Sequence, residues 1–234
     1  MDPTPTTERR LAWVERVLAA PPNVHANAPD GTAWMTEESC YRYMARQVEE
    51  GSRTLETGVG VSTVLFAAWE CDHLAVFPYA HEATPVENYC DEHGISRRSL
   101  AFDLRPSEIA LPTLAGATPF DLVFIDGCHG FPSPIIDWFY GAGLLRKGGV
   151  VVFDDINLPQ VGWLLRTFIE SDQRWETVTR TSKWGAFRRL SEGPLGEEWF
   201  DQPFFPPAPT KVIRRTRDLV PLSIKRPLRR FVNT

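Results

Sequence analysis

Three acidic residues and one histidine in this chain have types and spacing that could support acid–base or metal chemistry. They are Asp126, His129, Asp154 and Asp155. Carboxylate oxygens are the ligands that Mg²⁺ prefers, and a histidine ordinarily titrates near neutral pH, where it can accept a proton. In a structural alternative, Asp126 would cap a turn, and Asp154 and Asp155 would begin a helix. The pattern therefore predicts either a divalent metal site beside a general base, or acids that position a polar ligand.

The stretch from Phe120 to Ile156 predicts how these side chains are positioned. Apolar runs at Leu122–Ile125 and Val150–Phe153 end directly at the acids, and Ile135–Leu145 between them has helical apolar spacing. This is a strand, helix, strand unit whose two strands are parallel and buried on both faces. Open α/β sheets bind ligands at the carboxyl ends of their strands. We therefore expect the four side chains to converge on one crevice.

The remaining sequence predicts the sheet to which this unit belongs. Strands and helices alternate from Arg53 onward, which is typical of a doubly wound α/β fold with a mostly parallel sheet. Two short runs at the end of this region predict a terminal antiparallel hairpin. The predicted strands are Thr54–Thr57, Leu74–Phe77, Ser99–Phe102, Leu122–Ile125, Val150–Phe153, Trp175–Thr181 and Lys183–Leu190. The predicted core helices are Ser62–Trp69, Pro85–His93, Ser107–Leu114, Pro134–Leu145 and Leu158–Ser171.

The two ends of the chain differ from this core. Residues 1–50 predict helices and a loop packed on the core, with one helix at Glu8–Ala20 and a second that Thr36 caps and that runs to Glu50. We expect residues 51–191 to be the α/β core. Residues 192–234 predict a proline- and aromatic-rich strap followed by a basic tail.

Composition and charge narrow the classes of function. With 43% hydrophobic and 24% charged residues, the chain resembles an ordinary globular protein, and no apolar run approaches the roughly 18 residues of a membrane span. Four scattered cysteines and the lack of a signal-peptide pattern predict free thiols and a cytoplasmic location. Residues 211–234 hold eight basic residues and one acid, so the first 210 residues have a net charge of -12. An acidic body disfavours nucleic-acid binding, whereas the tail could contact an anionic membrane surface or an acidic partner.

A glycine-containing turn follows the first predicted strand, in the sequence Glu56-Thr57-Gly58-Val59-Gly60-Val61-Ser62-Thr63. Such a turn lets the backbone approach a ligand at the start of the next helix. A dinucleotide fingerprint would have a third glycine where Thr63 stands, which disfavours NAD. Together with FDLVFIDGCH at 120–129 and GGVVVFDD at 148–155, this turn resembles the class I S-adenosylmethionine-dependent methyltransferases. In particular, it is similar to the metal-dependent sugar and small-molecule O-methyltransferases, over about Ala33 to Leu190.

The resemblance implies a Rossmann-like methyltransferase fold and a transfer of methyl groups from S-adenosylmethionine to a hydroxyl of a sugar or glycan-like small molecule. The residues that it assigns to the cofactor are Glu56, Gly58, Gly60, Ser62, Thr63 and, on the adenine side, Asp103. It implies that Asp126, Asp154 and Asp155 hold a divalent metal, with Mg²⁺ expected, and that His129 and Asp126 are catalytic, His129 being the general base. In a metal-independent alternative, the same acids position the acceptor.

One position departs from the family pattern. Such enzymes carry an acid at the end of the second strand, where it binds the cofactor ribose, but Phe77 or Pro78 stands there. Glu82 in the following turn could substitute for it. The departure also supports an alternative function, in which the protein has the methyltransferase fold, does not bind the cofactor and acts as a binding or scaffolding partner. The N-terminal helix and the aromatic strap could join copies of the chain into a homo-oligomer.

Overall fold

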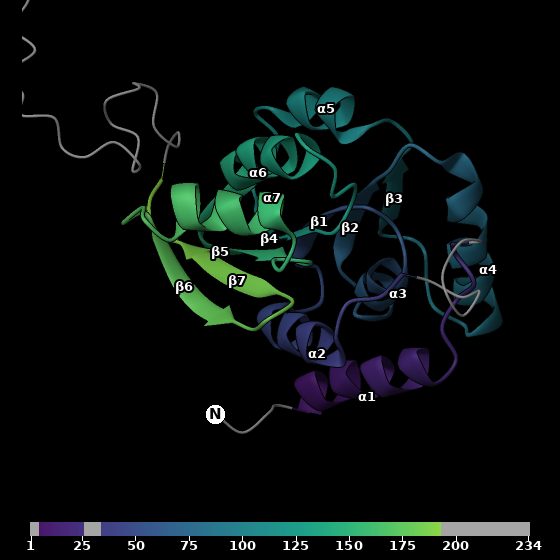
Figure 1. Ribbon diagram of the computed structural model, residues 1–234. Helices are drawn as coiled ribbons and strands as arrows, with labels where there is room; N and C mark the ends of the chain where they lie inside the picture. The colour runs from purple at the N-terminus through teal and green to yellow at the C-terminus, as the bar shows by residue number, and fades with distance from the viewer. Residues whose placement is uncertain (1–4, 26–33, 193–234) are drawn as a thin grey trace, which may run out of the picture. The chain divides into compact units, whose positions relative to one another are not determined.

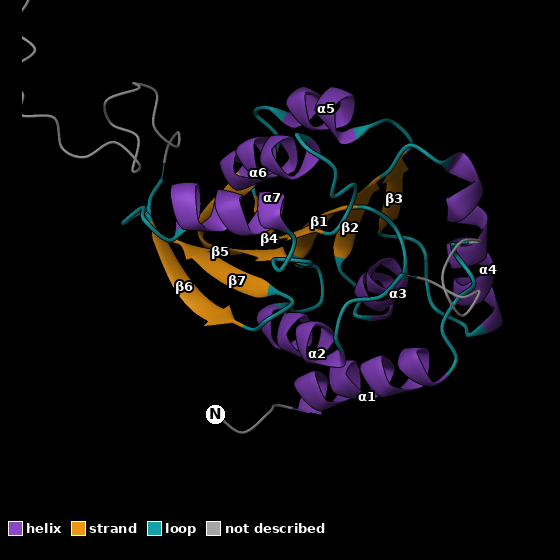
Figure 2. Cartoon of the chain, in the orientation of Figure 1, coloured by secondary structure: helices purple, strands orange, loops and turns teal. Residues whose placement is uncertain are grey.

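The sheet and its flanking helices are described by a computed structural model, which covers residues 5–25 and 34–192. Seven strands form one sheet in the order β3-β2-β1-β4-β5-β7-β6, and helices cover both of its faces (Figures 1 and 2). The strands are β1 (Arg53–Thr57), β2 (Asp72–Val76), β3 (Leu100–Asp103), β4 (Phe120–Ile125), β5 (Leu145–Phe153), β6 (Trp175–Arg180) and β7 (Gly185–Arg189). The first five strands are parallel, and β7 is antiparallel to both β5 and β6. The predicted doubly wound fold with its terminal hairpin is confirmed.

The helices lie between the strands or before them, as the alternating sequence predicts. They are α1 (Pro5–Ala19), α2 (Glu38–Gln47), α3 (Val61–Ala68), α4 (Ala83–Glu92), α5 (Ser107–Ala110), α6 (Ser133–Leu144) and α7 (Pro159–Leu164). Two short 3-10 helices, η1 (Ala80–Glu82) and η2 (Leu111–Leu114), and a π-helix, η3 (Leu165–Ile169), complete the described elements. The helices predicted at Ser107–Leu114 and Leu158–Ser171 are therefore each divided into two parts. Pro112 explains the first division, because proline has no N–H to continue an α-helix.

The core has two parts, one on each face of the sheet, because successive strand residues point to opposite faces. Leu122 and Phe124 of β4 pack in a cluster with buried residues of α1, α2, α3 and α4. Val123 and Ile125 of the same strand pack with residues of α5, α6 and α7. Both faces of the parallel strands are thus buried, which leaves the strand ends as the places where polar side chains can meet.

Some predictions concern residues outside the described part of the chain. The predicted strap and basic tail at 192–234 lie beyond the described residues, except for residue 192. Within residues 5–25 and 34–192, every helix falls short of the length and apolar character that a membrane span requires. All four cysteines are free thiols, as predicted, and only Cys128 is exposed.

Candidate active site

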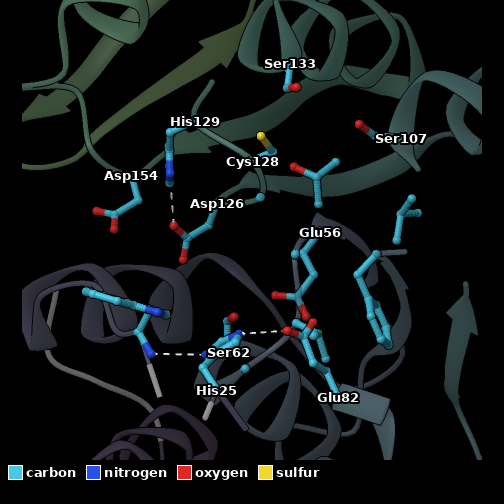
Figure 3. Close-up of a pocket in the computed structure, with 18 of the residues that line it drawn as sticks. His25, Glu56, Ser62, Glu82, Ser107, Asp126, Cys128, His129, Ser133 and Asp154 are labelled. Carbon is cyan, nitrogen blue, oxygen red and sulfur yellow. Dashed lines mark hydrogen bonds and ion pairs between the residues drawn. The ribbon is translucent and has the colours of Figure 1, made fainter. Parts of the chain in front are cut away.

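A cavity of about 510 Å³ lies at the carboxyl edge of the sheet, where β1, β2, β4 and β5 end. Most of the residues predicted for the site line it (Figure 3). The predicted site residues in its wall are Glu56, Gly58, Gly60, Ser62, Asp126, His129, Asp154 and Asp155. The predicted convergence of the strand ends on one crevice is therefore confirmed. Two predicted cofactor residues, Thr63 and Asp103, are not in the wall.

The turn after β1 requires glycine for two independent reasons. Gly58 has a φ of 104°, a conformation that other residues rarely adopt. A Cβ at this position would also lie 2.7 Å from the backbone oxygen of Asp126, which is less than any normal contact. A Cβ on Gly127 would lie 3.2 Å from the carbonyl carbon of Thr57. The β1–α3 turn and the β4–α6 loop therefore meet backbone to backbone and form one continuous wall of the cavity.

Thr63 orients Glu56 instead of lining the cavity. Its hydroxyl donates a hydrogen bond to the Glu56 carboxylate and accepts one, of 2.9 Å, from the N–H of Gly60 at the start of α3. The Glu56 Oε1 atom also lies 3.1 Å from Nε2 of His73, whose Nδ1 is 2.8 Å from the Thr54 hydroxyl. Glu56 is only 1% exposed, so these partners compensate for its burial and fix its orientation. This role of the Thr63 hydroxyl explains why a threonine stands where a dinucleotide fingerprint would have its third glycine.

Glu82 of η1 lies in the cavity wall beside the end of β2, together with Phe77 and Pro78. Burial raises the pKa of its carboxyl, and His81 opposes this in part. Nε2 of His25 lies 4.0 Å from Oε1 of Glu82. An acid is therefore present on this side of the cavity, although the strand itself ends without one.

His25 is a wall residue that was not predicted, because no local pattern marks it. Its Nδ1 accepts a hydrogen bond of 3.1 Å from the backbone N–H of Trp34, and its ring lies over the turn at Gly60. Burial lowers the pKa of the His25 imidazole, and a hydrogen bond with the backbone of Val59 partly opposes this. His25 and Trp34 thus close one side of the cavity.

Asp154 is held by a partner far away in the sequence. The Thr36 hydroxyl donates a hydrogen bond of 2.5 Å to Oδ1 of Asp154, which is 3% exposed. The prediction that Thr36 caps the following helix is therefore wrong, since the residue at the cap position is Glu37. A hydrogen bond to a buried carboxylate is stronger than one to a backbone N–H, which explains the preference. The structural alternative for Asp154 and Asp155 is also wrong, because α7 begins only at Pro159.

Lys183, in the turn between β6 and β7, contacts both acids at the end of β5. Its Nζ lies 2.5 Å from Oδ1 of Asp155 and 3.0 Å from Oδ2 of Asp154. Burial lowers the pKa of this ammonium, but the hydrogen bonds to the two carboxylates outweigh the effect and raise the pKa to about 12. Asp155 has a φ of 50°, a left-handed conformation that aspartate tolerates better than most residues. A cation is therefore already present where two of the predicted metal ligands meet.

His129 lies between two carboxylates. Its Nε2 is 3.8 Å from Oδ1 of Asp126, toward which it points in Figure 3, and its Nδ1 is 3.6 Å from Oδ2 of Asp155. The amide of Gln160 donates to the His129 backbone oxygen and anchors the loop. Burial raises the pKa of the Asp126 carboxyl well above its usual range, and nearby carboxylates, first that of Asp154, raise it further. The site therefore places an imidazole that can accept a proton between the carboxyl groups of Asp126 and Asp155.

The predicted metal site does not fit the side chains as they are arranged. Among residues 5–25 and 34–192, no group of three or more His, Cys, Asp or Glu side chains could hold a metal ion. Lys183 occupies an oxygen of Asp154 and one of Asp155, and a divalent ion at that place would have to displace its ammonium.

The side chain of Asp103 contacts Arg105. Its carboxylate accepts hydrogen bonds of 2.8 and 2.6 Å from the guanidinium of Arg105. These bonds lower the pKa of the Asp103 carboxyl, although partial burial opposes them. A contact between Asp103 and a cofactor stays a prediction.

Comparison with known proteins adds to this geometry. Residues 55–156 match the family model of a methyltransferase domain. The structure is similar to that of the O-methyltransferase from Bacillus cereus, solved in complex with SAH, at 19% identity and a TM-score of 0.55, with 81% of this chain and 93% of that chain covered. It is also similar to the O-methyltransferase TomG from Streptomyces achromogenes, involved in tomaymycin synthesis and solved with SAM, at 20% identity and a TM-score of 0.54, covering 81% and 92%.

An rRNA methylase from Streptococcus thermophilus has the same fold, at 12% identity and a TM-score of 0.52, with 68% of this chain and 100% of that chain covered. No curated protein sequence matches the chain. At these identities the likeness shows the fold alone, and because relatives of this fold modify different acceptors, the acceptor has to be inferred from the site.

Proposed function

From the premise that this chain is a class I methyltransferase, with its methyltransferase domain at residues 55–156, we propose that it transfers a methyl group from S-adenosylmethionine to a hydroxyl of a small, carbohydrate-like acceptor. The observation that carries the proposal is that one cavity joins the glycine turn after β1 to the cluster of Asp126 and His129. Methyl transfer requires a donor and an acceptor in line with each other in one water-poor site. Complexes of TomG with SAM and of the Bacillus cereus enzyme with SAH support the choice of cofactor.

The residues of the cavity fit this cofactor. Gly58 provides the backbone approach that a side chain would block, and Ser62 lies at the start of α3, where free N–H groups favour a carboxylate. Glu56 and Glu82 offer acceptor oxygens for hydroxyl and amino groups. When bound, S-adenosylmethionine supplies a methyl group on a positively charged sulfur. Burial and the neighbouring carboxylates together raise the pKa of Asp126, and those carboxylates favour a positive group in the cavity.

His129 would accept the proton of the acceptor hydroxyl. Its Nδ1 faces the carboxylate of Asp155 at 3.6 Å, which favours a proton on that nitrogen. Its Nε2 is buried and has no hydrogen-bond partner, so it is then the nitrogen left to take the proton of an acceptor bound against it. The carboxylate of Asp155 would stabilise the imidazolium that forms. The divalent metal predicted from the sequence has no step in this proposal, because Lys183 already holds Asp154 and Asp155.

A carbohydrate-like acceptor suits the mixed chemistry of the wall. Carboxylates bind vicinal hydroxyl groups, and an aromatic face stacks on the apolar side of a sugar ring. Trp34 lines the cavity with 58% of its surface exposed, and Asp126 and Asp155 lie in the same wall. These features support a small polyhydroxylated acceptor over an extended polymer.

Calorimetric titration with S-adenosylmethionine and S-adenosylhomocysteine tests the cofactor half of the proposal. We expect both to bind, and the absence of heat at high micromolar cofactor would reject the function and favour the scaffold alternative. Transfer of labelled methyl groups to a panel of monosaccharides, disaccharides and phenols then tests the acceptor half. The His129→Asn variant should bind the cofactor like the wild type and lose about 10²- to 10⁴-fold in turnover, the contribution of a general base. Equal turnover in both proteins would refute the role of His129.

A further inference from the structure

Lys183 is a cation that the fold builds into the acceptor side of the cavity. Its ammonium has three N–H donors, and Asp155 and Asp154 accept two of them, at 2.5 and 3.0 Å. Lys183 is also a wall residue of the cavity, with 30% of its side chain exposed. The third donor is therefore available to a ligand beside His129.

We propose that the ammonium of Lys183 takes the place of a divalent metal in this enzyme and binds the acceptor oxygen directly. The inference rests on the proposed methyl transfer and adds the way in which the acceptor oxygen is held and stabilised. The Lys183 ammonium carries one positive charge and lies between the carboxylates of Asp154 and Asp155, where a bound metal ion would be expected. Unlike a metal, it is covalently attached, and chelators cannot remove it.

Hydrogen bonds and the packing of a neighbouring side chain fix the backbone around Lys183. The Lys183 carbonyl accepts a hydrogen bond of 2.8 Å from the N–H of Ile156, directly after the two acids. The Thr181 hydroxyl accepts a hydrogen bond of 3.1 Å from the Lys183 N–H. The neighbouring Trp184 is buried and donates its indole N–H to Ser39 of α2 at 2.8 Å. The ammonium is therefore held on a rigid turn and loses little freedom when it binds a ligand.

The chemistry of the step follows from this arrangement. The acceptor O–H gives its proton to Nε2 of His129, and the oxygen forms a bond to the methyl carbon. The bond between that carbon and sulfur breaks, its electron pair stays on sulfur, and S-adenosylhomocysteine is the product. Lys183 donates a hydrogen bond to the oxygen while negative charge develops on it, and keeps its own proton throughout. A fixed donor of this kind stabilises the transition state more than the ground state.

Titration of the protein with Mg²⁺ tests whether Lys183 takes the place of the metal, and it does not require an assay of methyl transfer. We expect no binding heat for the wild type, because the ammonium repels the ion and occupies its ligands. The Lys183→Met variant keeps the length of the side chain and removes its charge, so Asp154 and Asp155 are released. Its affinity for Mg²⁺ should rise at least about tenfold, since carboxylates are the ligands that this ion prefers. Lys147→Met, at an exposed position of β5, is the matched control and should behave like the wild type.

Mg²⁺ binding to the wild type overturns the proposal, and so does the absence of any gain of Mg²⁺ binding in Lys183→Met. Thermal unfolding of the variant, compared with the wild type, shows whether a lack of binding reflects a loss of the fold. Where an acceptor is found, the wild type should keep its turnover in a chelator, and Lys183→Met should lose about 10²- to 10³-fold, as expected for one transition-state donor. Retained turnover in Lys183→Met also overturns the proposal. Failure of the proposed function itself would appear separately, as absence of cofactor binding in all three proteins.

Discussion

Replacement of Asp137 by asparagine should stabilise this protein at neutral and alkaline pH. Asp137 lies on α6, is 1% exposed, and its Oδ1 atom has no hydrogen-bond partner. Burial raises the pKa of its carboxyl to about 6, although the side chains of Ser107 and Thr57 lower it in part and the charge of Glu108 raises it. At pH 8 the folded protein therefore holds an ionised carboxylate in an environment that disfavours charge.

The size and the sign of the effect follow from proton linkage. The pKa rises from 3.8 in the unfolded chain to about 6 in the folded protein. The folded protein binds more protons between these values, so the stability that the neutral carboxyl contributes is complete below pH 3.8 and is lost as pH rises to about 6. A shift of roughly two pKa units corresponds to a loss of about 3 kcal/mol. Asparagine has the same shape and cannot ionise, so it avoids that loss.

Urea denaturation of Asp137→Asn and wild type between pH 4 and pH 8 measures this difference. We expect the variant to exceed the wild type by up to about 3 kcal/mol at pH 8 and the advantage to disappear toward pH 4. Glu92→Gln removes an exposed acid from α4 and should show no pH-dependent difference. A difference between Asp137→Asn and wild type that stays constant across the pH range would refute the reasoning.

Two further substitutions test the cofactor side of the cavity. Gly58→Ala combines a left-handed φ with a Cβ 2.7 Å from the Asp126 backbone, whereas Gly51→Ala has a φ of 76° and open space. In urea denaturation, backbone strain should lower the free energy of unfolding of both variants by about 1–3 kcal/mol. The close contact should lower that of Gly58→Ala further, and only this variant should bind S-adenosylmethionine more weakly. Equal losses would argue against the close contact. Glu82→Gln should weaken that binding by about tenfold in calorimetry, the value of one hydrogen bond to a charged group, and an unchanged affinity would exclude Glu82 from the ribose site.

The fold and part of the site could be predicted because strands and strand ends leave local signals. Asp126, Asp154 and Asp155 follow apolar runs directly, so a parallel sheet had to bring them to one edge. Glu82 could be named only as a substitute, because its approach to the cavity depends on the turn after β2. The Thr36 hydrogen bond joins residues 118 positions apart and leaves no local pattern.

Lys183 shows which information about the site could not be read from the sequence. The partner of Phe153 in the antiparallel pairing of β5 with β7 is Gly185, and continuing that register places Lys183 opposite Asp155. The sequence predicts the hairpin, but it does not give the pairing register, and a shift of one residue would turn the lysine to the other face. Knowledge of that one register would have been enough to add Lys183 to the site.

The cavity wall combines residues from inside and outside the segment that matches the methyltransferase domain. Glu56, Ser62 and His129 belong to the segment 55–156 that matches the methyltransferase domain, whereas Trp34 and Lys183 come from before and after it. A protein engineer could therefore randomise the two outer segments to search for new acceptors while the proposed donor-binding half stays untouched. The same division would let related chains diverge in acceptor preference through changes that never reach the glycine turn.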